Sequence, residues 1–516
     1  MKKVKKFLIF LIVLILAVCS LSVTSFAGNS EKTVDGITYK LYGTYYAVSD
    51  AIQYTYASET DKSTPVTIKS EIDGIPVTKI DEHAFSNSKE TKYSNIVSLV
   101  IPSSVTSVPA NAFKDCTSLE SVKFETSVKT VKIKEGLFDG CENLKEVTLP
   151  TMMTDEIGQY FFRNCYNLTN IEIPEGVTEL GAYAFLNLKQ LKSISLPSTL
   201  TTINDGAIFN CPRLINITVN GGTSFKIINS ALYSYDGKEL ISYPIGLSVD
   251  NKEYTVSSGT KRIGYGAFAD SLLEKITLPY GLEEIGGYAF YTCEKLSEIN
   301  IPETVKYIGT NKKGERFDES NAFMQCSSLK EITIPAGIIN YRAAFVSSGL
   351  EKVTFADGTT EIQSNAFGYC YSLKEVYIPS SITSIEKGYF ENLDNIVIYC
   401  EDSSYAKQFA AENGIEYEAH KVDPEIKNAK TATCTSKGYS GDTYCKACGN
   451  KISSGVEISA LGHDFSKLIS SSNATFFSNG SKVYQCTHEG CTETKTEITL
   501  STFNRILAWF RNLFSF

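Results

Sequence analysis

The residues of this chain that are best suited to chemistry are cysteines and histidines near its C-terminus. Cys445 and Cys448 are separated by two residues and followed by Gly449, which is the spacing of a zinc knuckle. Cys434 and His463 flank this pair, and the four side chains would complete a tetrahedral Cys₃His set. The pattern therefore predicts a zinc site in a small module that needs a bound metal to stabilise its fold.

A second copy of this module points to different chemistry. It aligns Phe476 with Cys434 and keeps only Cys486 and Cys491. A metal site is expected to retain its ligands when its module is duplicated, and an exported protein can form disulfides. The alternative is a disulfide between Cys486 and Cys491, with one further bridge among the three cysteines of the first copy. Both alternatives for the tail cysteines, a zinc site and disulfide bonds, stay open.

Seven further cysteines occupy one position of a longer repeat. They are Cys116, Cys141, Cys165, Cys211, Cys293, Cys326 and Cys370. Leu188 fills the same position in another repeat, which marks an apolar packing site, and a free cysteine behaves as a small buried hydrophobe. We expect these seven side chains to be buried thiols.

The chain shows no pattern typical of a catalytic centre. It has four histidines, and its carboxylates do not recur as an acid–base pair. No glycine-rich phosphate loop follows a predicted strand. We predict no catalytic residues and no cofactor apart from the zinc considered above, and a secreted hydrolase is the least favoured functional class.

The elements that must position these residues are repeats. The phrase Ala-Phe-x-x-Cys-x-x-Leu-x-x-apolar-x-apolar returns about a dozen times, for example at 289–301 and 366–378. Most steps between successive anchors are 22 to 25 residues, which indicates a solenoid whose repeats bury one another's apolar faces. The anchors are Phe85, Phe113, Phe138, Phe162, Phe185, Ile208, Leu232, Phe268, Phe290, Phe323, Phe345, Phe367 and Phe390.

Each repeat predicts two short strands. The first has an apolar-x-apolar-Pro pattern, as in Ile276-Thr277-Leu278-Pro279, which places both apolar side chains inward and the middle one outward. Threonine is frequent at the outward position, both because it suits strands and because it can hydrogen-bond to a ligand. A ligand of this exposed strand face would meet Lys123, Thr148, Glu172, Ser195, Thr218, Thr277, Asn300, Thr333, Thr354 and Tyr377.

The spacing between successive anchors is longer at two places. The step from Leu232 to Phe268 is 36 residues and contains an Asp-Gly hairpin turn at 236–237. The step from Phe290 to Phe323 is 33 residues and holds a polar insertion at 312–316. Insertions in solenoids map to loops, so uniform curvature is not expected at either place.

The N-terminus predicts export. Four lysines precede an apolar run at 7–18, and Ser25-Phe26-Ala27 supplies the small-x-small cleavage pattern of a secretory signal peptide. Removing residues 1–27 takes four lysines and no acids from a chain of net charge −9, which leaves −13. An acidic chain of this kind is a poor partner for nucleic acid, which requires clustered Lys and Arg.

The last sixteen residues predict an amphipathic helix. Its apolar face holds Phe503, Ile506, Leu507, Phe510, Leu513 and Phe514. With two arginines and no acid, the helix suits a membrane surface or a hydrophobic partner. Packing of this face onto the tail modules is the alternative.

On the strength of the repeated phrase, residues 79–419 resemble the BspA-like leucine-rich repeat family of bacterial surface proteins. The resemblance implies a gently curved, right-handed, mainly β solenoid with short helical turns, capped at both ends, and a surface role without catalytic residues. Two small β-rich Cys-containing modules would follow it. The expected parts are a signal peptide (1–27), an N-terminal cap (28–78), the solenoid with its C-terminal cap (79–419), two small Cys modules (420–465 and 466–500) and the amphipathic segment (501–516).

Three functional classes follow from these features. The favoured one is a secreted or cell-surface protein that binds protein or glycan on host or neighbouring cells, as members of the resembled family do. The second is a structural component of the cell envelope, held there by residues 501–516. The third is the secreted hydrolase disfavoured above.

Overall fold

The computed structural model describes residues 30–56, 62–87, 89–126, 130–153, 156–222, 224–310, 321–363, 365–386, 390, 393 and 395–514. It divides into two compact units, Met1–Ala419 and His420–Phe516. The expected signal peptide and the polar insertion at 312–316 lie outside the described residues.

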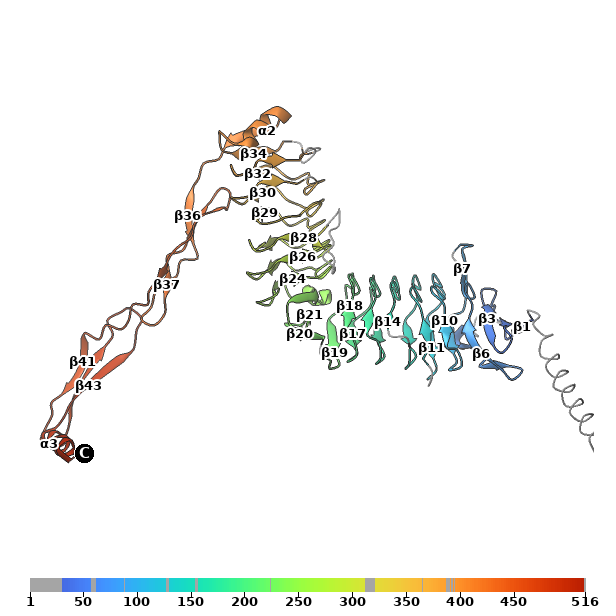
Figure 1. Ribbon diagram of the computed structural model, residues 1–516, viewed down its shortest axis with the longest axis horizontal. Coiled ribbons are helices and arrows are strands. Elements are labelled where there is room, and N and C mark those ends of the chain that lie inside the picture. The colour runs from blue at the N-terminus through green and yellow to red at the C-terminus, as the bar shows by residue number, and fades with distance from the viewer. Residues whose placement is uncertain are drawn as a thin grey trace, which may run out of the picture. The chain divides into compact units, whose positions relative to one another are not determined.

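The first unit is a mainly β solenoid in which strands of successive coils lie side by side (Figure 1). Most coils contribute two short strands, and these form two separate rows of largely parallel sheets. The first strand row comprises β4 (Val66–Thr67), β9 (Ser98–Ile101), β11 (Ser121–Phe124), β13 (Glu146–Thr148), β15 (Asn170–Glu172), β17 (Ser193–Leu196), β19 (Asn216–Val219), β23 (Glu253–Thr255), β25 (Lys275–Thr277), β27 (Glu298–Ile299), β29 (Glu331–Ile334), β30 (Lys352–Phe355), β32 (Glu375–Tyr377), β34 (Val397–Cys400) and β35 (Glu416–Ala419).

The second strand row follows the first strand of the coil, and in many coils a proline separates the two, as Pro197 does after β17 and Pro335 after β29. It comprises β6 (Ile75–Ile80), β10 (Ser107–Val108), β12 (Lys132–Ile133), β14 (Glu156–Ile157), β16 (Glu179–Leu180), β18 (Thr202–Ile203), β22 (Glu239–Ser242), β24 (Arg262–Ile263), β26 (Glu284–Gly286), β28 (Tyr307–Thr310), β31 (Glu361–Ile362) and β33 (Ser384–Ile385). Proline ends the first strand because it has no amide hydrogen to donate to the preceding coil, as Asn220 donates to Leu196 where proline is absent. The two-strand repeat predicted from the alternation is therefore confirmed.

Stacked aromatic rings run through the core, and most coils contribute one, although Ile208 takes this position in one coil. Phe113 and Phe138 lie 5.4 Å apart between ring centroids and are nearly parallel, and Phe290 and Phe323 lie 4.8 Å apart in the same way. Burying rings of this size between coils supplies the apolar area that a single coil cannot bury alone. Every anchor phenylalanine other than Phe390 is at most 1 % exposed.

The predicted anchor Leu232 is wrong. Leu232 is buried, but it lies in a strand of an inserted hairpin, and Tyr243 occupies the anchor position of that coil. The Tyr243 ring stacks on Phe268 at 5.4 Å, and its backbone N–H donates to the carbonyl of Ala267, as Phe268 donates to Ala289 in the next coil. The hairpin shifted the apparent period, so the spacing selected the wrong apolar residue.

The hairpin itself interrupts the solenoid. It consists of β20 (Phe225–Ile228) and β21 (Ala231–Ser234), followed by an Asp-Gly turn into β22, as the sequence predicted. The buried residues form two clusters that meet at Ala231 and Leu232. A short 3-10 helix, η2 (Ile245–Val249), follows in the next coil.

Both ends of the solenoid are covered. At the N-terminal end β1 (Glu31–Val34), β2 (Ile37–Leu41) and β3 (Tyr46–Asp50) form an antiparallel meander that joins β6. Two small hairpins, β5 (Glu71–Ile72) with β6 and β7 (Ser86–Asn87) with β8 (Lys92–Tyr93), flank the first coils. At the C-terminal end α2 (Tyr405–Asn413) begins after the Ser404 cap and ends at left-handed Gly414.

The second unit contains two antiparallel three-stranded sheets. The first is formed by β36 (Pro424–Lys427), β38 (Asp442–Cys445) and β39 (Lys451–Ser453), with β37 (Gly438–Tyr439) and β40 (Glu457–Ile458) paired beside it. The second is formed by β41 (Lys467–Ser472), β42 (Gly480–Gln485) and β43 (Thr494–Thr499), and α3 (Thr502–Phe514) follows. Among the described residues, no helix has the length and apolar character required to span a bilayer.

Candidate functional site

The outward residues of the first strand row stand in register across neighbouring coils. Thr148 pairs with Lys123, and Thr218 pairs with Ser195, which in turn pairs with Glu172. Parallel pairing without a register shift places these side chains in one file across each sheet. The file is the candidate binding surface of the solenoid.

Most of the predicted surface residues are exposed, and Ser195 is half-buried. Thr354 and Tyr377 are exceptions, because they are only 2 % and 7 % exposed. The Tyr377 ring stacks on Tyr399 at 4.6 Å, and Lys352 Nζ lies 5.1 Å from its centroid. Tyr377 pairs with Thr354 in the register of the sheet and both are buried, so the prediction that both residues are presented to a ligand is wrong.

Asn300 is exposed, but its amide already has a structural role. Its Nδ2 donates to the carbonyl of Leu278 at 3.0 Å, and its Oδ1 accepts from the Leu278 backbone N–H at 2.9 Å. The side chain thus makes the pair of hydrogen bonds that strand backbone would make beyond the end of β27. A ligand would have to compete with this pair of hydrogen bonds.

The sequence prediction missed members of the same file. Thr255 is exposed and pairs with Thr277, and Thr67 is exposed and continues the file towards the N-terminus through Val100. The Tyr254-Thr255-Val256 and Val66-Thr67-Ile68 segments both carry the apolar-x-apolar alternation, so the signal that would have found these two residues is present in the sequence.

A hollow of about 370 Å³ opens where the first strand row is interrupted between β13 and β15. Its rim carries Thr148, Thr151, Glu172 and Glu175, and its apolar wall includes Leu149. Backbone and hydroxyl hydrogen bonds from Ser198 hold the Glu175 carboxylate and lower its pKa. Volumes of this order suit a side chain or a sugar unit of a larger ligand.

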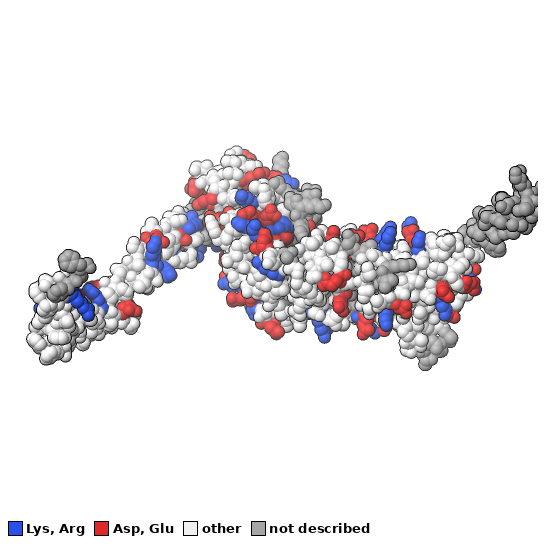
Figure 2. Space-filling model, turned by 60° about the horizontal axis from the view of Figure 1, so that its bottom comes forward, with Lys and Arg blue, Asp and Glu red and all other residues white. Residues whose placement is uncertain are grey.

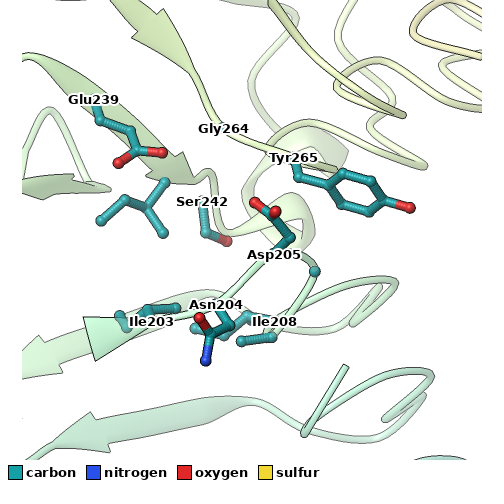
Figure 3. A pocket seen from close by; sticks show the side chains of 11 residues that line it. Ile203, Asn204, Asp205, Ile208, Glu239, Ser242, Gly264 and Tyr265 are labelled. Carbon is teal, nitrogen blue, oxygen red and sulfur yellow. The ribbon is translucent and has the colours of Figure 1, made fainter. Parts of the chain in front are cut away.

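A second pocket, at the break between β18 and β22, is much smaller. Figure 3 shows Asn204 and Asp205 on one side of it and Glu239 and Ser242 on the other. Its volume of about 20 Å³ is enough for roughly one water molecule, so an organic ligand does not fit.

Charge on the solenoid is mixed. On the face that Figure 2 shows, acidic and basic side chains are interspersed along the coils. Several of them pair across coils, as Lys275 does with Glu298 at 2.5 Å and Lys261 with Glu283 at 2.8 Å. Such neutralised pairs suit neither a polyanion nor a polycation as ligand.

The seven repeat cysteines are buried, as predicted, and none forms a disulfide. Each thiol donates to the backbone carbonyl of an anchor phenylalanine in the preceding part of the stack, as Cys165 does to Phe138 at 3.1 Å. Burial raises their pKa, to about 12 for Cys116, Cys211 and Cys326.

The tail cysteines form two clusters, and neither is the predicted set. Cys434, His463, Cys486 and Cys491 present their ligand atoms within 4.8 Å of one another, whereas His420 joins Cys445 and Cys448 in a separate group. The four-residue set Cys434, Cys445, Cys448 and His463 is therefore wrong. It assumed that each module holds its own site, while Cys434 reaches into the cluster of the next module.

The predicted disulfide between Cys486 and Cys491 is also not formed. Burial opposes ionisation of the Cys486 thiol, but hydrogen bonds from the His488 backbone amide and from His463 lower its pKa to about 6. Burial and the neighbouring sulfurs of Cys491 and Cys486 raise the pKa of Cys434 to about 12.

The apolar face of α3 is uncovered. Phe503, Ile506, Leu507, Phe510 and Leu513 are 41–54 % exposed, and Trp509 beside them is 58 % exposed; the side chain of Phe514 lies outside the described part. The start of the helix contacts the turn between β41 and β42, through Phe503 on Phe477 and Asn504 on Asn479. The alternative in which this face packs onto the tail modules is not what the structure contains.

A family model described as the BspA type leucine rich repeat region matches residues 78–154, 129–239, 247–312 and 319–409, with six copies. No curated protein matched the chain in sequence.

Solved structures show the same fold. A leucine rich cell surface protein of Faecalibacterium prausnitzii is 24 % identical with a TM-score of 0.51, and the match covers 76 % of this chain and 99 % of that one. The pneumococcal vaccine antigen PcpA is 22 % identical with a TM-score of 0.54, over the same shares of the two chains.

Proposed function

The chain belongs to the BspA-type leucine-rich repeat family, and from this premise we propose that it is an exported, non-enzymatic protein that binds protein or glycan on host or neighbouring cells. One of the similar solved structures is described as a cell surface protein, which supports a surface location. Nucleic acid is not among the proposed partners, because the chain is acidic and its surface charge is mixed.

The observation that carries this proposal is the in-register file of exposed Thr and Glu side chains, with half-buried Ser195 among them, next to the hollow at Thr148 and Glu172. Uncharged hydroxyl groups lose little solvation when a ligand covers them, and a rigid file repeats the same weak contact from coil to coil. A long flat partner can therefore gain affinity without a deep pocket.

The test uses the chain without residues 1–27 on arrays of immobilised host matrix proteins, glycans and bacterial envelope fractions. Thr148→Arg, Thr218→Arg and Thr277→Arg together place bulky charges on the file, and we expect at least a tenfold loss of affinity for the bound array member. The matched control replaces three exposed threonines beside the second strand row, Thr201→Arg, Thr360→Arg and Thr383→Arg, and should bind like the parent chain. Equal loss in both triple variants, or hydrolysis of any array polymer, would contradict the proposal.

A second candidate function is favoured by one observation, the uncovered apolar face of α3. In this alternative the chain is a structural component of the envelope, held there by residues 501–516. Binding to envelope fractions alone, abolished by deletion of 501–516 and unaffected by the Thr→Arg triple variant on the file, would favour it over the adhesin.

A further inference from the structure

The second unit contains a group of side chains that the proposed binding surface does not use. Cys434 Sγ lies 3.7 Å from Cys486 Sγ, and Cys491 Sγ lies 3.5 Å from His463 Nδ1. In a tetrahedral zinc site with bonds of about 2.3 Å to sulfur and 2.0–2.1 Å to nitrogen, the corresponding edges are about 3.8 Å and about 3.5 Å. Two edges of the group therefore match those of a tetrahedral zinc site, and all four ligand atoms lie within 4.8 Å of one another.

The backbone holds these residues in place from both modules. The N–H of Gly462 donates to the carbonyl of Cys434 at 3.0 Å, which brings His463 beside Cys434. Cys486 donates its backbone N–H to Glu493 at 3.0 Å, and Cys491 donates to the carbonyl of His488 at 3.1 Å, so both sulfurs of the Cys486–Cys491 loop face inward. The ligand set is thus prepared by main-chain contacts that do not depend on a metal.

The duplication explains why the second copy has lost a cysteine. Gly438 packs so tightly on the backbone of Ala432 that a Cβ would clash, and Gly480 does the same on Ala474, so the two turns are equivalent. In the first copy, Leu461 and Gly462 donate to Thr433 and Cys434 at 2.8 and 3.0 Å.

The equivalent contacts in the second copy involve α3 instead of another module. Thr502 and Phe503 donate to Thr475 and Phe476 at 3.4 and 2.9 Å, and Phe503 packs on Phe477 at 5.8 Å. The side chain at the Cys434 position therefore contributes a ligand atom to the cluster of the module that comes next in the chain. Where α3 follows rather than a module, a phenylalanine that contacts the helix takes the place of the ligand.

The first cluster fits the same scheme. His420, Cys445 and Cys448 correspond to His463, Cys486 and Cys491, and the described residues bring only these three ligating side chains together there. The backbone N–H of Lys446 donates to Asp423 at 2.7 Å, as that of Thr487 donates to Asp464 at 2.9 Å. The ligand that a preceding module would supply is the one that this cluster lacks.

We propose that the tail carries a structural zinc site shared between its two modules, with Cys434 from the first and His463, Cys486 and Cys491 from the second as ligands. Because His463 corresponds to His420, the second module begins at His463 and not at residue 466. Three thiolates and one imidazole in a closed tetrahedron suit Zn²⁺ better than the hard cations, which prefer oxygen. Bound zinc ties the loop that follows β36 to the ends of β42 and β43, so it fixes the junction between the modules.

His488 is the residue that competes for the fourth position. Its Nδ1 lies 3.3 Å from Cys434 Sγ and 3.6 Å from Cys486 Sγ. It stands outside the group of four mutually close ligand atoms, so in the proposed site its N–H donates to the metal-bound sulfurs and orients them. His463→Ala should therefore remove zinc, whereas His488→Ala should retain it with weaker affinity.

The test uses the chain without residues 1–27, purified under reducing conditions and loaded with Zn²⁺ or Co²⁺. Metal analysis of the zinc form should show that Cys434→Ser loses one equivalent, whereas Phe476→Ala, at the matching position of the second copy, loses none. The Co²⁺ form of the unaltered chain should show the intense visible bands of a tetrahedral site and sulfur-to-cobalt charge transfer from three thiolates, which does not depend on any variant folding. The proposal is overturned if the reduced chain binds no metal, or if the chain purified without reductant is metal-free and holds a Cys434–Cys486 or Cys486–Cys491 disulfide. An equivalent that Cys448→Ser removes and Cys434→Ser does not would overturn it as well.

Discussion

The Sγ atom of Cys141 lies 2.9 Å from the carbonyl oxygen of Phe113, in the preceding coil. The same bond recurs from Cys293 to Phe268 at 3.1 Å and from Cys326 to Phe290 at 3.2 Å. The Phe113 carbonyl also accepts from the backbone N–H of Cys116 at 3.1 Å, so the thiol supplies a second, weak donor while it stays apolar enough for the core. This relationship gives the repeat cysteine a function in the stack that packing alone does not require.

The buried thiols make the solenoid sensitive to alkali. Burial raises the pKa of Cys326 to about 12, from about 9 in an exposed thiol. Between these values the unfolded chain releases the proton and the folded chain keeps it, so stability present below pH 9 is lost as the pH rises towards 12. We expect the midpoint of thermal unfolding to fall steadily over this range.

Cys326→Ala isolates the contribution of one thiol. At pH 8 the variant should be less stable than the parent chain by about 1–2 kcal/mol, because it loses volume and a hydrogen bond. At pH 11 this difference should shrink or reverse, because alanine has no proton to lose. Urea titrations at the two pH values measure it, with exposed Lys295→Ala as control; a difference independent of pH would show that the thiol does not titrate on unfolding.

The ring stack predicts a large loss of stability when a single anchor ring is removed. Phe290 lies between Phe268 and Phe323, at 5.4 and 4.8 Å, and is fully buried. Phe290→Ala leaves a cavity between two coils and should destabilise the solenoid by about 3–5 kcal/mol. Tyr280→Ala, at a 78 % exposed aromatic, is the control and should change the unfolding midpoint little. Equal effects of the two substitutions would mean that the stack does not hold the coils together.

Much of the solenoid could be predicted because its physics is local and repeated. A period of 22 to 25 residues, with apolar-x-apolar alternation and a proline, specifies two strands and an inward ring in coil after coil. The repeat spacing selected the wrong anchor residue at Leu232, because a hairpin adds residues there without adding a coil. Tyr243 supplies the stacked ring of that coil. The prediction that Thr354 is exposed was wrong. The exposure of this side chain depends on the size of its neighbour Tyr377 in the next coil, and a repeat pattern does not encode that size.

The tail site could be predicted only in part. Spacing identified Cys434 and His463 as candidate metal ligands, and it grouped them with the wrong partners. The error has a physical cause, since sequence proximity favoured Cys445 and Cys448, while hydrogen bonds from residues 461 and 462 to the Cys434 turn bring in the next module. Contacts between modules are set by tertiary packing, and spacing within one module carries no record of them.

One ion pair inside the solenoid should matter more than the many at its surface. Arg163 donates two hydrogen bonds to Asp139, at 2.6 and 2.7 Å, and the Asp139 side chain is only 4 % exposed. Arg163→Met leaves a buried carboxylate with Lys114 at 3.6 Å as its remaining cation, and should cost about 3 kcal/mol. The double variant Arg163→Met, Asp139→Leu should recover part of this loss in a thermal melt. If the double variant is as unstable as the sum of both single changes, the cost is one of packing and not of an uncompensated charge.

The only tryptophan of the chain, Trp509, lies on α3 and is 58 % exposed, so intrinsic tryptophan fluorescence reports on this helix alone. If the uncovered apolar face enters a lipid surface, vesicles containing phosphatidylglycerol should shift the emission of Trp509 to shorter wavelength, because the indole leaves water. Arg505 and Arg511 are the only charged residues of the helix, so added salt should weaken the shift with anionic vesicles. Leu507→Gln with Phe510→Gln should abolish it, whereas Ala508→Gln, on the opposite face, should leave it intact. An unchanged spectrum with the parent chain would remove the support that α3 gives to an envelope role and leave the solenoid surface as the proposed means of attachment.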